Sequence, residues 1–172
     1  MLCLLSIMEG EFGMSEGEAK KSYDFTISSA PGQRSFRKRL LINTVQAREV
    51  VDVSDHVREF VKTSGIKNGL ISCYNTHTTS ALILANRREG VAQIISNVLG
   101  EDLRAEHTAG ILQSYKGDPQ VMAAYVSSAI LGNSIIIPIE DGSLLMGEWQ
   151  GLYFVEFSGP RERQVILTAI GS

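Results

Sequence analysis

The order of apolar and polar residues predicts blocks of strand and helix along most of the chain. Residues 36–51 alternate charged and aliphatic positions, and residues 70–74 form an apolar run typical of a buried strand. Between them, residues 54–63 carry apolar side chains at helical spacing. Ser54 is the expected N-cap of this helix, because its hydroxyl can accept a hydrogen bond from a free amide of the first turn.

The second half of the chain separates into helices and then strands. Apolar residues at 91–99 predict an amphipathic helix that Gly100 ends, and residues 119–131 predict another helix. The strands expected after it cover residues 134–139, 144–146, 151–157 and 164–170. Asp141-Gly142 separates the first two of these strands, which is a strong hairpin signal.

This arrangement predicts the α+β class with a largely antiparallel sheet, because helices lie between strand blocks and the last strands follow one another. Residues 1–35 differ from the rest, since they are rich in Gly and Glu and contain the breaker Ala30-Pro31-Gly32. We expect them to form a poorly ordered N-terminal extension, with 23–27 as an added edge strand. Residues 36–172 are expected to form a single domain.

Composition narrows the functional classes. The chain has 172 residues, 44% of them hydrophobic, and a formal net charge of −3, which gives no support to binding of nucleic acid or an anionic membrane. No stretch approaches the roughly 20 apolar residues of a membrane-spanning helix. Two cysteines, Cys3 and Cys73, are too few for a disulfide scaffold or a cysteine-rich zinc module. We therefore expect a soluble cytoplasmic protein.

His77-Thr78-Thr79 is the sharpest chemical feature of the sequence. It follows a predicted strand and places an imidazole and two hydroxyls close together. Such a group can bind a metal, a phosphate or a carbonyl. The alternative is an exposed loop histidine whose threonine neighbours satisfy local backbone groups.

Two further segments carry candidate chemistry. Gly147 and Gly151 flank Glu148, Trp149 and Gln150, and the glycines would let backbone approach a ligand closely; the alternative is a core tryptophan at a β-turn. The arginines of residues 158–163 could clamp a phosphate or carboxylate, and the alternative is a charged hairpin tip.

Taken in order, several short motifs resemble one family, the YjbQ-like proteins, often labelled secondary thiamine-phosphate synthase enzymes. The resemblance covers residues 36–172. The matching motifs are Asp52-Val53-Ser54, His77-Thr78-Thr79-Ser80-Ala81-Leu82, Leu131-Gly132-Asn133-Ser134, Ile137-Pro138-Ile139, Gly147-Glu148-Trp149-Gln150 and Gly159-Pro160-Arg161. The ordered set is much more specific than any one motif.

The resemblance implies a compact sandwich or barrel-like fold with a few helices on one side, assembled as a homotrimer. It also implies a small-ligand pocket near His77, with His77 and Trp149 lining one concave site. We therefore assign His77 as the catalytic candidate. The predicted ligand-binding residues are Thr78, Thr79, Glu148, Trp149, Gln150 and Arg161.

The sequence departs from the family pattern where metal ligands are expected. Ala85-Asn86 stands where members usually carry Asn-Glu, and later family histidines fall near Ser114 and on Tyr125. Only His77 of the histidine set remains, whereas a transition-metal site normally needs three or four protein ligands. We assign no metal site and leave any cofactor open.

The resemblance favours a transferase of the thiamine-phosphate synthase type that acts on small phosphorylated substrates. That reaction needs a stabilised pyrophosphate and an aromatic platform for a pyrimidine cation. The alternative is a non-catalytic homotrimer that binds a small anionic ligand in the same pocket. A third hypothesis is a structural or interaction protein with a vestigial pocket.

Overall fold

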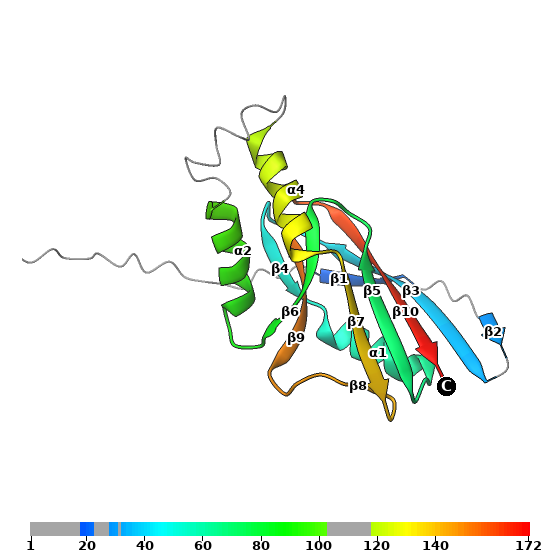
Figure 1. Cartoon of the computed structure of the whole chain (residues 1–172). Coiled ribbons are helices and arrows are strands. Elements are labelled where there is room, and N and C mark those ends of the chain that lie inside the picture. The colour runs from blue at the N-terminus through cyan, green and yellow to red at the C-terminus, as the bar shows by residue number, and fades with distance from the viewer. Residues whose placement is uncertain (1–17, 23–27, 31, 103–117) are drawn as a thin grey trace, which may run out of the picture.

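Two antiparallel sheets curl around a common core in the computed structural model, which describes residues 18–22, 28–30, 32–102 and 118–172 (Figure 1). The seven-stranded sheet has the order β1-β3-β10-β5-β7-β8, with β2 also paired to β3. Its strands are β1 (Glu18–Ser22), β2 (Ser28–Ala30), β3 (Gln33–Asn43), β5 (Gly69–Asn75), β7 (Ser134–Glu140), β8 (Ser143–Leu144) and β10 (Glu162–Gly171).

The second sheet is smaller and carries one end of the candidate site. It has the order β4-β9-β6, with β4 (Glu49–Asp52), β9 (Gln150–Glu156) and β6 (Ser80–Asn86). Glu156, the last residue of β9, lies opposite Glu49 in the β4–β9 pair and opposite Ser80 in the β6–β9 pair. Because directly opposed residues point to the same face of a sheet, these three side chains share a face.

The helices pack on different surfaces of these sheets. α1 (Ser54–Ser64) places Val57, Phe60 and Val61 in the main core with the facing sides of both sheets. α2 (Val91–Asp102) and α4 (Pro119–Leu131) lie together beside β6 in Figure 1. They close a second apolar cluster on the other face of the small sheet, with β-strand and helix members such as Ala81, Tyr153, Ala92 and Ala124.

The predicted α+β class is confirmed. The hairpin at Asp141-Gly142 is confirmed as well, since the two residues join β7 to β8 with φ of 49° and 77°. Positive φ at both central residues is what a tight two-residue hairpin requires. Asp118 caps α4 by accepting a hydrogen bond from the amide of Gln120 at 2.8 Å, and Pro119 begins the helix.

Three local predictions were wrong. Ser54 is the first residue of α1 rather than its cap, because its hydroxyl pairs with the backbone of Leu152 and accepts from that amide at 2.9 Å. Gly100 lies inside α2, which continues to Asp102. The strand expected at residues 144–146 is only the two-residue β8.

The described part of residues 1–35 pairs with the large sheet. β1 runs antiparallel to β3 from Glu18 opposite Asn43 to Ser22 opposite Arg39, and β2 pairs with the start of β3. The extra edge strand expected at residues 23–27 falls outside the described residues. The sheet therefore begins before residue 36.

Candidate functional site

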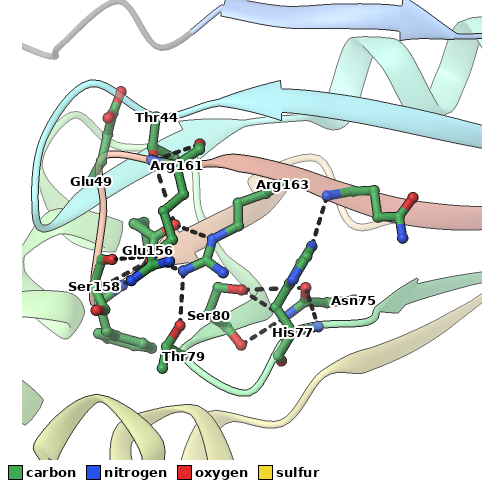
Figure 2. A network of polar contacts seen from close by, with 12 residues as sticks. Thr44, Glu49, Asn75, His77, Thr79, Ser80, Glu156, Ser158, Arg161 and Arg163 are labelled. Atoms are coloured by element: carbon green, nitrogen blue, oxygen red, sulfur yellow. Dashed lines mark hydrogen bonds and ion pairs between the residues drawn. The ribbon is translucent and has the colours of Figure 1, made fainter. Parts of the chain in front are cut away.

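Three connections between strands meet at one end of the two sheets. They are the β3–β4 connection at residues 44–48, the β5–β6 connection at 76–79, and the β9–β10 connection at 157–161. Backbone hydrogen bonds join them, from Gly159 to Ala47 and from Phe157 to Thr79. Figure 2 shows the polar side chains that these connections bring together, and we call this region the network end.

A buried ion pair forms the centre of the network end. Arg163 donates from Nε and from Nη2 to the two carboxylate oxygens of Glu156, each at 2.6 Å, and its Nη2 also donates to Thr79 Oγ1 at 2.8 Å. Glu156 further accepts the amides of Phe157 and Ser158. Since both side chains are almost fully buried, the charges are compensated by each other and by these hydrogen bonds.

Thr44 ties the ion pair to the neighbouring connection. Its hydroxyl accepts the amide of Arg161 at 2.9 Å and lies within donating distance of the Arg161 carbonyl and of Glu156. A Cβ on Gly159 would collide with the backbone oxygen of Gln46 and the hydroxyl of Thr44. Glycine at this position of the Gly-Pro-Arg motif therefore allows the two connections to pack directly together.

Glu49 is a second buried carboxylate at this end. One oxygen accepts the amides of Val45 and Gln46, which holds the β3–β4 connection in shape. The other oxygen is buried and has no hydrogen-bond partner. Glu49 lies opposite Glu156 across β4 and β9, so two carboxylates and one arginine share this part of the interior.

Asn75 fixes the His-Thr-Thr segment. Its side chain is buried. The side-chain nitrogen Nδ2 donates to the backbone oxygen of Ser80 at 2.6 Å, and the side-chain oxygen Oδ1 accepts the His77 amide at 3.2 Å. Ser128 of α4 donates to the same Ser80 oxygen at 2.7 Å. The connection that carries His77 is thus held from both ends.

His77 has a defined hydrogen-bonding state. Its Nε2 accepts the backbone amide of Gln164 at 3.0 Å. A backbone N–H can only donate, so Nε2 must be unprotonated, and in a neutral imidazole the proton then lies on Nδ1. Burial lowers the pKa of His77 from its ordinary value of 6.5, the nearby Arg163 lowers it further, and Glu156 opposes the shift. His77 is therefore a neutral side chain with a donor at Nδ1.

The other predicted residues at this end differ in exposure. Thr78 is exposed, whereas Thr79 is half-buried and its hydroxyl accepts from Arg163. Arg161 is exposed, and its Nε donates to the Ser158 carbonyl at 2.9 Å. The structure thus connects Thr79 and Arg161 through the hydrogen bonds of Arg163, Glu156 and Thr44. His77 lies close enough to feel the charges of Arg163 and Glu156, but its own hydrogen bonds go to Gln164 and Asn75.

Glu148, Trp149 and Gln150 lie at the opposite end of β9. They form a turn in which Gln150 donates its amide to Gly147 O and accepts the Gly147 amide with its side chain, both at 2.9 Å. Trp149 is 63% exposed and its carbonyl accepts the amide of Arg87. We call this region the turn end.

The structure does not bring the turn end to His77 within one chain. The six residue steps of β9 from Gln150 to Glu156 span roughly 20 Å at about 3.3 Å per residue. The alternative that Trp149 is a core residue is also wrong, because its side chain is exposed.

Sequence reasoning missed the residues that make most contacts at the network end. Arg163 belongs to the segment expected either to clamp a phosphate or carboxylate or to form a charged hairpin tip, whereas it is buried against Glu156 of the same chain. Glu156 could have been noticed, because it is a single charge within the apolar run of 152–157. Asn75 carried no signal beyond its place at a strand end.

Two of the positions where the family carries other candidate ligands lie in the described residues. Tyr125, at a histidine position, is exposed on α4, and Ala85, in the Asn-Glu register, is buried opposite Gly151. Ser114, near the other histidine position, falls outside the described residues. Among the residues that the structure describes, no three His, Cys, Asp or Glu side chains gather as metal ligands. Cys73 is buried in the core, and burial raises the pKa of its thiol to about 12.

The fold and the network end together define a small α+β protein built on a curled antiparallel half-barrel. A sequence profile described as "UPF0047 protein YjbQ-like" matches residues 38–172, so the chain belongs to the YjbQ-like (UPF0047) family. This confirms the resemblance noted from the motifs.

Relatives and solved structures agree with this assignment. The chain is 32% identical to a UPF0047 protein of Archaeoglobus fulgidus over 76% of this chain and 98% of that protein, and 31% identical to UPF0047 protein YugU of Bacillus subtilis over 78% and 98%. A YbjQ-like protein of unknown function from Sulfolobus solfataricus superposes with a TM-score of 0.69 at 25% identity, over 81% of this chain and 99% of that one.

Membrane insertion through helices has no support in the described residues. None of the helices there combines the length and apolar character needed to cross a bilayer.

Proposed function

We propose that the network end binds a small anionic ligand, with small phosphorylated molecules as the ligand class. The observation that carries the proposal is the hydrogen bond from the Gln164 amide to His77 Nε2. It leaves Nδ1–H as the free polar group of the imidazole, and no described residue accepts from it. A neutral donor suits a phosphate oxygen, because no charge has to be created on the imidazole.

Thr78 and Arg161 add to the donor set. Both are exposed beside the buried network. The Nε–Ser158 hydrogen bond holds the stem of Arg161, while the terminal amino groups make no hydrogen bond with described residues. Guanidinium groups bind phosphate in fork geometry, whereas Arg163 is already neutralised by Glu156 and supplies no free charge.

These contacts favour binding over proton transfer. The lone pair of Nε2 is engaged by a backbone amide, so His77 cannot act as a base through that nitrogen without breaking the bond. We therefore place the non-catalytic, ligand-binding function first. The homotrimer implied by the resemblance is part of this proposal, and light scattering of the full chain tests it.

The binding test uses inorganic phosphate and pyrophosphate as probes in isothermal titration calorimetry. We expect His77→Ala and Arg161→Ala each to weaken binding at least about tenfold, since each removes a direct contact to the anion. Arg87→Ala is the matched control, because it removes an exposed arginine at the turn end. Absence of binding by the wild type, or equal binding by all four proteins, would contradict the proposal.

A transferase of the thiamine-phosphate synthase type is the second candidate, and family membership is what favours it. It would need an aromatic platform beside the held phosphate, and Trp149 is separated from His77 by the length of β9. The test is incubation with a pyrimidine pyrophosphate and a thiazole phosphate, followed by detection of thiamine phosphate and released pyrophosphate. Product that disappears in His77→Ala would support the transferase, and no product would leave binding as the function.

A further inference from the structure

The turn end carries aromatic and polar groups that the proposed function does not use. The pairing of β6 with β9 ends with Asn86 opposite Gln150, and the backbone hydrogen bond from Arg87 to Trp149 at 2.8 Å continues it by one step. Arg87 therefore lies directly opposite Trp149. Directly opposed side chains point to the same face of a sheet, with Cβ atoms about 5 Å apart. A guanidinium group and an aromatic ring thus share one face.

Tyr153 adds a hydroxyl to the same face. Trp149 directly precedes β9, and Gly151 and Tyr153 follow it at alternate positions, which point to one face of a strand. A Cβ on Gly151 would collide with the Tyr153 ring and lie 2.8 Å from its hydroxyl oxygen. Glycine at this position therefore lets the ring lean along the strand toward Trp149 and Arg87.

Tyr153 lies within reach of two opposite charges. Burial raises the pKa of Tyr153 above its ordinary value of 10.0, the Asp52 carboxylate raises it further, and the Arg87 guanidinium opposes the shift. Tyr153 therefore keeps its proton at neutral pH, and its hydroxyl can donate a hydrogen bond.

The polar side-chain groups at this place have no partner within the described part of the chain. There, the Arg87 guanidinium makes neither a hydrogen bond nor an ion pair, and the Tyr153 hydroxyl and the Trp149 indole nitrogen make no hydrogen bond. Arg87 and Trp149 are both exposed. We call Arg87, Trp149 and Tyr153 the turn-end cluster.

The backbone of the turn-end cluster is held before any ligand binds. Gln150 and Gly147 close the turn that carries Trp149 with two hydrogen bonds, and the backbone of Arg87 is bonded to that of Trp149. In Figure 1, β6 and β9 lie side by side at this end, where the chain turns into α2. A ligand would therefore order only side chains, which lowers the entropic cost of binding.

We infer that the turn-end cluster binds a planar aromatic carboxylate. The flat ring of the ligand stacks on the exposed indole of Trp149 in the offset geometry that aromatic pairs prefer. The carboxylate accepts two parallel hydrogen bonds from the Arg87 guanidinium and a further one from the Tyr153 hydroxyl. Because the Cβ atoms of Arg87 and Trp149 are only about 5 Å apart, the carboxylate should be attached close to the ring.

Charge at the turn end favours a carboxylate over a phosphate. The carboxylates of Asp52 and Glu148 belong to the same region as Arg87. One guanidinium fork matches a singly charged carboxylate, whereas two nearby carboxylates repel a doubly charged phosphate more strongly. The ligand class therefore differs from that of the network end, at the other end of β9, and either site can exist without the other.

The experiment follows the fluorescence of Trp149, the single tryptophan of the full chain, during titration with benzoate. We expect saturable quenching with a Kd of roughly 1 mM, since so small a ligand has few atoms to contribute. Benzamide keeps the ring without the charge, and cyclohexanecarboxylate keeps the charge without the flat ring. Each should bind at least about tenfold more weakly than benzoate. Inorganic phosphate should leave the fluorescence unchanged, because it has no ring to stack.

Variants test the individual groups. Arg87→Ala should weaken benzoate binding at least about tenfold, and Tyr153→Phe, which removes only the hydroxyl, should weaken it several-fold. Arg88→Ala is the matched control, because it removes the neighbouring exposed arginine, and it should bind benzoate like the wild type. For Trp149→Ala, line broadening of the benzoate NMR signals replaces fluorescence, and the broadening seen with the wild type should disappear.

Three results would overturn the inference. They are absence of saturable quenching in the wild type, equal binding of benzoate and cyclohexanecarboxylate, and equal affinities of Arg87→Ala and Arg88→Ala for benzoate. Phosphate binding at the network end is measured with different probes and different variants, so failure here and failure of the proposed function are distinguishable.

Discussion

The two ends of β9 have similar sequences in chemical terms and very different environments. At the network end Glu156 is buried, paired with Arg163 and hydrogen-bonded to the amides of Phe157 and Ser158. At the turn end, Glu148, Trp149 and Gln150 are all exposed, although they also combine a carboxylate, an aromatic ring and an amide. Both ends belong to motifs that pointed to one site.

The difference follows from what meets at each end. Strands of both sheets end or begin at the network end, so their connections cover one another and exclude water. The turn end is a single tight turn closed by hydrogen bonds between Gly147 and Gln150, with one further backbone hydrogen bond from Arg87 to Trp149. A polar motif therefore becomes a buried network only where several connections converge.

Arg163→Met should have the largest effect. It leaves the buried Glu156 carboxylate without its partner, and breaking a buried pair in this way lowers the free energy of unfolding by about 3–5 kcal/mol. Urea unfolding measures this loss. Arg87→Met, at the turn end, is the control and should change stability by less than about 0.5 kcal/mol, because Arg87 is exposed.

Asn75→Ala should have the next largest effect. It removes the side chain that holds Ser80 and the His77 amide, and such a loss inside a protein lowers the free energy of unfolding by about 1–3 kcal/mol. Asn86→Ala is the matched control at the turn end, because Asn86 ends β6 and its side chain accepts only the exposed Arg88 amide. Similar losses in both variants would contradict the contrast between the ends.

The titration of His77 should have a smaller effect, which appears as a pH dependence of the free energy of unfolding. Because its pKa is lowered in the folded protein, the unfolded chain binds more protons once pH falls through about 6.5. The free energy of unfolding of the wild type should therefore fall as pH drops below that value, and the fall should level off once pH is below the pKa of His77 in the folded protein. Above about pH 6.5 His77 is neutral in both states and causes no loss of stability. Urea unfolding of wild type and His77→Gln across this range should show the extra loss only in the wild type.

Trp149→Ala should have the smallest effect on folding. The exposed ring has little packing to lose, so stability should change by less than about 0.5 kcal/mol, in place of the several kcal/mol expected for a core tryptophan. Trp149 is the single tryptophan, so its fluorescence reports on this position alone. Blue-shifted emission, poorly quenched by iodide, together with a large stability loss, would show that the turn end is covered.

Much of the fold could be predicted from local patterns. The helix at 119–131, the hairpin at Asp141-Gly142 and the buried strand at 70–74 depend on periodicity and turn chemistry, and these were confirmed. The failures were local features with a distant partner. The hydroxyl of Ser54 accepts the Leu152 amide instead of capping its own helix. A local sequence pattern cannot predict a hydrogen bond to a residue so distant in the chain.

The sequence by itself determined the class of fold and the family, because these depend on residue order and spacing, and it predicted the His77 segment as a candidate site. Only the tertiary structure decided which polar residues share a site. It joined His77 to Arg163 and Gln164, more than 80 residues apart in the chain, and separated it from Trp149. The reason is that strand register and sheet packing set these distances, and both result from the pairing of segments remote in sequence.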